Sequence, residues 1–210
     1  MNWHQLVYCG GFTAVGTLGG CLDLRKSHRI PNWLTYSGII CGLTAHLMLD
    51  GWRGLGSSFI AGLLGFLFVL PFYLKRGMAG GDLKLVVATS TLAALPYFYS
   101  VLVWSALSAA AIAFFTALAT GYLKTAILNT FSILAHSANS PLSPHPELNV
   151  DNPAVLKVPF GAGVAIGCII ALAVALSQSG MTLHSYSLRA GTHIFSRLTT
   201  NSHLGALSHE

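Results

Sequence analysis

Charged side chains are scarce in this chain of 210 residues, because Asp, Glu, Lys and Arg together make up only 8% of it. Soluble domains carry about a quarter of such residues, so the composition argues against an ordinary soluble protein. The sequence also has no CxxC pair among its four cysteines and no HExxH spacing among its nine histidines. A zinc site and a disulfide framework are therefore not indicated. We expect no metal and no cofactor, and a net charge of +5 spread over so few charges does not indicate nucleic-acid binding.

The apolar residues of the chain are concentrated in long stretches. Hydrophobic residues make up 53% of the chain, and its mean hydropathy is +0.64. Several stretches reach the ~20 residues that a helix needs to cross ~30 Å of hydrocarbon. The sequence therefore predicts an all-α polytopic membrane protein with about six transmembrane helices, at residues 6–22, 33–49, 55–74, 83–95, 98–123 and 158–176.

Basic residues fall mainly on one side of these predicted helices. If the N-terminus is outside, eight of them lie in inside segments (Arg25, Lys26, Arg29, Lys75, Arg76, Lys84, Lys124 and Lys157) and three outside (Arg53, Arg189 and Arg197). This asymmetry obeys the positive-inside rule, so we expect both termini on the periplasmic side. The predicted organisation is a transmembrane domain at 1–177, with a long cytoplasmic loop at about 124–157, followed by a polar tail at 178–210.

Carboxylates are rarer still, and their positions are informative. The chain has six: Asp23, Asp50, Asp82, Glu147, Asp151 and Glu210. Under the predicted topology, only Asp23 and Asp82 lie at inside helix ends. Two carboxylates placed side by side there would share a proton and could polarise a water molecule. The alternative for Asp82 is a helix N-cap, in which its side chain accepts a backbone N–H.

Short motifs accompany the two aspartates in a fixed order. They are Asp23-Leu24-Arg25 with Arg29-Ile30-Pro31-Asn32, then Gly81-Asp82-Leu83-Lys84-Leu85, then Pro159-Phe160-Gly161. Over roughly residues 6–176, this arrangement resembles the type IV prepilin peptidases, which are integral-membrane aspartic peptidases of the bacterial inner membrane.

The resemblance implies that Asp23 and Asp82 are catalytic. The implied reaction is removal of the leader peptide of a type IV prepilin at the cytoplasmic membrane face, with the prepilin leader and its transmembrane helix, and the lipid bilayer, as partners. The residues in supporting positions are Lys84, Gly80, Gly81, Arg29, Asn32, Pro159 and Gly161.

Two departures from the family pattern bear on this expectation. The family's Gly-x-Gly-Asp would require glycine at position 79, where this chain has Ala79. We expect Gly77, Gly80 and Gly81 to keep the turn loose, since glycine tolerates conformations that alanine resists. The loop after the first helix has only about ten residues and lacks the cysteines of longer members, which also N-methylate the pilin. The chain is therefore similar to the short form of tight-adherence (Flp) pili, and we do not expect methyltransferase activity.

Several roles stay open at this point. Lys84 could tune Asp82, contact substrate or snorkel to the interface. Asn32 could cap the second helix or bond an aspartate, and Pro159 and Gly161 could shape a helix start near the site. A presenilin-type protease fits less well, because Asp23 follows leucine rather than tyrosine. Other classes are a small transporter that uses the two aspartates as ion or proton sites, and a non-catalytic membrane subunit of a pilus machine.

Overall fold

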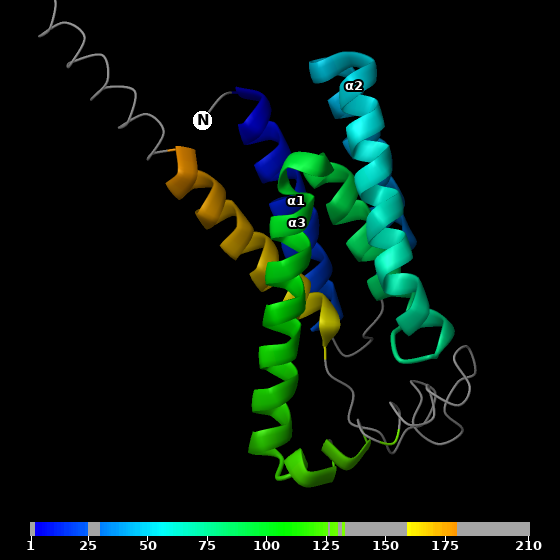
Figure 1. Ribbon diagram of the computed structural model, residues 1–210, viewed down its shortest axis with the longest axis vertical. Coiled ribbons are helices and arrows are strands. Elements are labelled where there is room, and N and C mark those ends of the chain that lie inside the picture. Colours follow the sequence, from blue (N-terminus) through cyan, green and yellow to red (C-terminus); the bar gives the residue numbers. More distant parts are fainter. Residues whose placement is uncertain (1–2, 25–29, 126, 130–131, 133–158, 180–210) are drawn as a thin grey trace, which may run out of the picture. The chain divides into compact units, whose positions relative to one another are not determined.

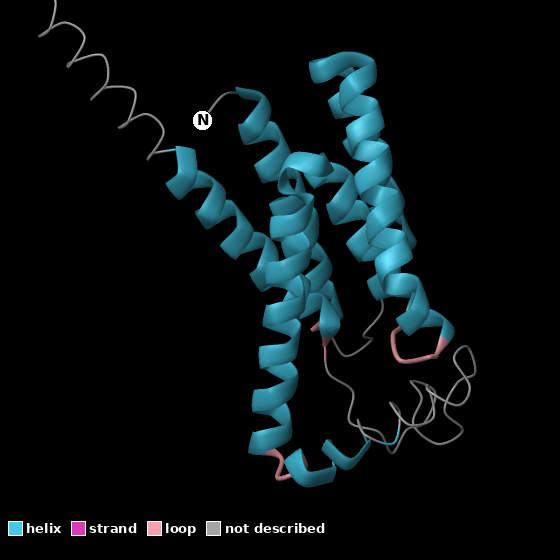
Figure 2. Cartoon of the chain, in the orientation of Figure 1, coloured by secondary structure: helices cyan, strands magenta, loops and turns pink. Residues whose placement is uncertain are grey.

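The computed structural model of the protein describes residues 3–24, 30–125, 127–129, 132 and 159–179 (Figure 1). Its long elements are α1 (Trp3–Asp23), α2 (Asn32–Leu74), α3 (Gly80–Ala119) and a further helix, Phe160–Ser179, here called the C-terminal helix. Figure 2 shows helices joined by loops and turns, without a strand among the described residues. The all-α prediction is confirmed for this part of the chain. Most of the predicted loop at 124–157 and of the tail at 178–210 lies outside it.

Membrane-spanning length and hydropathy occur in three of the described helices: α2, α3 and the C-terminal helix. These elements identify a membrane protein in agreement with the composition. The prediction of six spans, and of both termini outside, stays a prediction. Contacts group the described residues up to Leu172 into one compact unit and those from Ala173 into another. The site lies entirely within the first of these units.

Helix α2 reverses direction at Gly51, whose φ of 64° and ψ of −150° break the helix. Before the break, Gly38 lies against Ala88, and Gly42 against Thr91, so this half runs parallel to the start of α3. After the break the contacts run the other way, with Gly62 against Thr91 and Gly65 against Ser90. Glycine suits the break, because L side chains rarely adopt a positive φ. The sequence analysis leaves residues 50–54 between two predicted helices, and the structure places the break at Gly51.

Helix α3 also reverses, at Ala94, where φ is 48°. Its first half runs antiparallel to α1, with Leu85 against Gly19 and Leu92 against Gly11. Its second half packs antiparallel to the C-terminal helix, with Ala109 against Gly163 and Ser105 against Gly167.

The C-terminal helix is itself antiparallel to α1, because Gly20 lies against Ala165 and Gly16 against Cys168. The second half of α3 is therefore parallel to α1 and opposite to its own first half. A Cβ on Gly20 would come within 2.5 Å of the Ala165 Cβ, so this helix pair depends on glycine for its close approach.

Side chains of α2 form hydrogen bonds with the backbone groups of α3 that lose their helical partners at the Ala94 reversal. Pro96 has no N–H to offer the Leu92 carbonyl. Instead, His46 Nε2 lies 3.1 Å from that oxygen and must be the donor, because a carbonyl only accepts. Ser58 donates to the Thr91 carbonyl at 2.7 Å, and the Leu95 N–H donates to Ser57 Oγ at 3.1 Å. Such pairing is what makes an interrupted helix tolerable in an apolar span.

Candidate active site

Asp23 and Asp82 lie near each other at one end of this unit. Asp23 is the last residue of α1, and Asp82 lies in the first turn of α3. About one turn further in, the two helices touch: a Cβ on Gly19 would lie 2.5 Å from Leu85 Cδ1. The carboxylates are close enough for the charge on Asp23 to act on Asp82. The helix contact that brings them together could not be deduced from the sequence alone.

Asp23 is buried, with 6% of its surface exposed, and its carboxylate accepts a hydrogen bond from the C-terminal helix. The backbone N–H of Gly161, in the first turn of that helix, donates to Asp23 Oδ2 at 2.9 Å. Pro159 directly precedes the helix. The Pro-Phe-Gly motif therefore forms a helix start that touches the first of the two aspartates.

Asp82 does not cap its helix, so the N-cap alternative is wrong. The N-cap of α3 is Ala79, without a capping side chain, and Asp82 lies three residues later. The Asp82 carboxyl group is hydrogen-bonded to the backbone of Ala79. Ala79 has a φ of −75° and a ψ of 150°, an extended conformation that any residue adopts. Alanine in place of the family glycine therefore imposes no backbone strain at position 79.

The expectation that Gly80 and Gly81 loosen the turn before Asp82 is also wrong. Both are already helical, as the first two residues of α3. The residue with a positive φ is Arg76, at 53°. Gly81 instead provides close approach, since a Cβ there would lie 3.3 Å from the Ile30 Cβ. Its absent side chain lets the buried Ile30, just before α2, rest on the first turn of α3.

Lys84 and Asn32 form a separate polar contact at the same end. Lys84 Nζ donates to Asn32 Oδ1 at 2.9 Å and lies 5.2 Å above the Tyr36 ring. Residues two apart on a helix point in different directions, so Lys84 does not share the Asp82 face. Asn32 is not the cap of α2, because the N-cap is Pro31 and has no side-chain bond. This pair ties the start of α2 to the start of α3.

Arg29, the remaining predicted site residue, lies outside the described residues. Within the described ranges, no group of three or more His, Cys, Asp or Glu residues could hold a metal ion. The polar groups gathered at this end are two carboxyl groups, a backbone N–H and a lysine–asparagine pair. They suit acid–base chemistry on a polar substrate.

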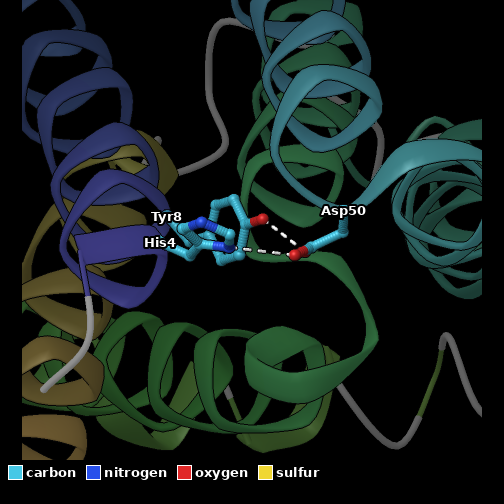
Figure 3. A network of polar contacts seen from close by, with 3 residues as sticks. All are labelled: His4, Tyr8 and Asp50. Carbon is cyan, nitrogen blue, oxygen red and sulfur yellow. Dashed lines mark hydrogen bonds and ion pairs between the residues drawn. The ribbon is translucent and has the colours of Figure 1, made fainter.

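A second polar cluster, which sequence reasoning missed, lies at the opposite helix ends (Figure 3). Asp50, beside the α2 reversal, accepts a hydrogen bond from the Tyr8 hydroxyl and lies 3.0 Å from His4 Nδ1. Tyr8 stacks on His46, the residue that bonds the Leu92 carbonyl. The sequence analysis places Asp50 on the outside between two predicted helices and gives it no role. The available signal was the spacing of His4 and Tyr8, which puts both on one face of α1.

Comparison with protein families gives a match to the type IV leader peptidase family over residues 12–134. The matched range includes Asp23, Asp82 and Lys84, and it ends before the Pro159–Gly161 helix start. Searches of the curated proteins and of the solved structures found no match.

Proposed function

The chain belongs to the type IV leader peptidase family, and we propose that it is an aspartic endopeptidase whose catalytic pair is Asp23 and Asp82. The observation that carries this proposal is their juxtaposition, since two of only six carboxylates come from different helices to one end of the unit. Like charges this near do not both ionise easily, so the pair shares a proton.

Chemistry by such a pair needs one ionised and one protonated carboxyl group. The ionised member takes a proton from water as the water oxygen attacks the scissile carbonyl carbon, and the protonated member gives its proton to the carbonyl oxygen. In collapse, the C–N bond breaks, the amine leaves with the first proton, and the second returns to the carboxylate that gave it. One water is consumed, and the pair is restored.

The proposed substrate is a type IV (Flp-like) prepilin whose leader reaches the site from the cytoplasm. The positive-inside distribution of Arg and Lys supports a cytoplasmic placement of the aspartate end in a bacterial inner membrane. Lys84 and Asn32 lie at this end and are proposed to position the substrate or the helix starts around it. Methyltransferase activity forms no part of the proposal.

The test is co-expression with a Flp-like prepilin and measurement of leader removal by gel. Asp23→Asn and Asp82→Asn should each abolish cleavage at unchanged membrane abundance, because an amide cannot exchange protons as the carboxyl pair does. Asp50→Asn, which neutralises the carboxylate at the other end, is the matched control and should still cleave. Cleavage by either active-end variant at the wild-type rate would exclude the pair as the catalytic centre. No cleavage even by the unmodified protein would point to a different substrate or to the transporter.

A further inference from the structure

We propose that the start of the C-terminal helix is part of the peptidase site, with Gly161 as a positioning residue whose backbone N–H fixes the Asp23 carboxylate near Asp82. This inference rests on the proposed function, because Gly161 acts only through Asp23. It assigns to the Pro159–Gly161 motif a task in holding the Asp23 carboxylate in place, with the pH profile of the aspartate pair as its readout.

The hydrogen bond has the features of a strong one. Gly161 N and Asp23 Oδ2 are 2.9 Å apart in a buried contact, and Asp23 is only 6% exposed. A bond from N–H to a carboxylate is stronger than a neutral one, and more so away from water. The first N–H groups of a helix have no partner within the helix and point outward at its positive end. Gly161 therefore offers an unused donor to the buried carboxylate.

Glycine is required at this position by the approach of Asp23 itself. A Cβ on Gly161 would lie 2.8 Å from the Asp23 Cβ and 3.0 Å from its Oδ2. From the other side, a Cβ on Gly20 would lie 2.8 Å from the Gly161 carbonyl oxygen. Only with both glycines can the end of α1 reach the helix backbone closely enough for this bond. The contact is built by two segments that are 138 residues apart.

The consequence for catalysis concerns the singly ionised form of the pair. Interacting carboxyl groups titrate as a unit, and the acid limb of a kcat/KM profile reports where the free enzyme loses its essential base. A donor that binds only the ionised carboxylate well extends that form to lower pH. Removing the donor should therefore move the acid limb to higher pH by about one unit.

The most direct experiment replaces the Gly161 amide with an ester. Cell-free translation into lipid nanodiscs with glycolic acid at position 161 exchanges N–H for oxygen and adds no side chain. Cleavage of a Flp-like prepilin is then followed from pH 4 to 9. The expected result is an acid limb about one pH unit higher than in the unmodified protein. The same ester at Gly163, which packs on Ala109 instead, is the control and should leave the limb in place.

A pair of alanine variants provides a second measurement that does not depend on the ester. Gly161→Ala and Gly163→Ala each add a Cβ that lies under 3 Å from a neighbour, but only the first displaces Asp23. Compared at equal membrane abundance, Gly161→Ala should raise the acid limb as the bond lengthens. Gly163→Ala should leave the acid limb in place, and any loss of rate should be the same factor at every pH.

The outcomes separate this inference from the proposed function. If Asp23→Asn and Asp82→Asn are inactive, and the acid limb shifts only in the variants at position 161, both the catalytic pair and the role of Gly161 are supported. If both aspartate variants are inactive but the acid limb does not move in the Gly161 ester or in Gly161→Ala, the role of Gly161 is overturned and the catalytic pair stands. Normal cleavage by Asp23→Asn overturns the catalytic pair, and the positioning role with it.

Discussion

The two ends of the helical unit use carboxylates in opposite ways. At one end, Asp50 is 42% exposed in its side chain and shares both oxygens with the side chains of His4 and Tyr8. At the other end, Asp23 is buried, takes a backbone N–H, and faces the charge of a second carboxylate. The first arrangement pairs a charge with groups that satisfy it and ties the helix reversals together. The second holds two like charges near each other, which costs stability and is typical of catalysis.

Lengthening each acid by one methylene should separate the two ends most sharply. Asp23→Glu keeps the charge but pushes it into Gly161, so we expect leader cleavage to fall by about 10²-fold or more, in the range of misplaced acid–base groups. Asp50→Glu has room at the half-exposed end and should change the rate less than about threefold. Initial cleavage rates of the two variants at equal enzyme abundance test this prediction. Equal losses of rate in Asp23→Glu and Asp50→Glu would show that the two ends are not functionally distinct.

Glycines that make close helix contacts beside the site should tolerate substitution less well than exposed glycines on the same helix. Gly20→Ala places a Cβ 2.5 Å from the Ala165 Cβ, and overpacking of this kind costs about 1–3 kcal/mol. Gly10→Ala has no heavy atom within 4 Å and should be neutral or slightly stabilising. Unfolding followed in detergent compares the two free energies. A Gly20→Ala variant as stable as Gly10→Ala would contradict the close helix contact.

At the opposite end, the bond from His46 to the Leu92 carbonyl should matter for stability but not for chemistry. His46→Leu leaves a buried carbonyl without its donor, which costs about 1–3 kcal/mol. The residual folded enzyme should cleave at a normal rate per molecule. Thermal unfolding and rates normalised to folded protein test both parts. A lost rate at normal stability would instead link His46 to the reaction.

The smallest effect is expected at Lys84. Its bond to Asn32 is solvent-exposed, so Lys84→Gln should change the unfolding free energy by less than about 1 kcal/mol. Asn32→Ala should produce the same change, and the double variant no more than either alone. A double-mutant cycle measures this. If Lys84→Gln also raises KM while Asn32→Ala does not, Lys84 contacts the substrate.

The sequence was most informative where local chemistry decides the structure. The gap between the predicted helices 33–49 and 55–74 contains the Gly51 reversal, and the predicted end of a helix at about residue 95 lies beside the Ala94 reversal. The scarcity of acids singled out Asp23 and Asp82.

Contacts between distant segments could not be predicted in the same way. Nothing local to Gly161 indicates that its N–H binds Asp23, or that His46 supplies the donor that Pro96 lacks. Local rules also misassigned the Asp82 turn. Arg76 takes the positive φ there, and Gly80 and Gly81 are helical.

The position of the Ala94 reversal has a consequence for the bilayer itself. From Gly80 to Ala93, the first half of α3 has fourteen residues and a length of about 21 Å, whereas the hydrocarbon core is about 30 Å thick. In the proposed arrangement this hydrophobic mismatch must be met by thinning of the lipid around the helix or by a watery indentation above Asp82. Either response brings water and a cytoplasmic peptide below the nominal membrane surface, so bilayer thickness becomes a variable of the reaction.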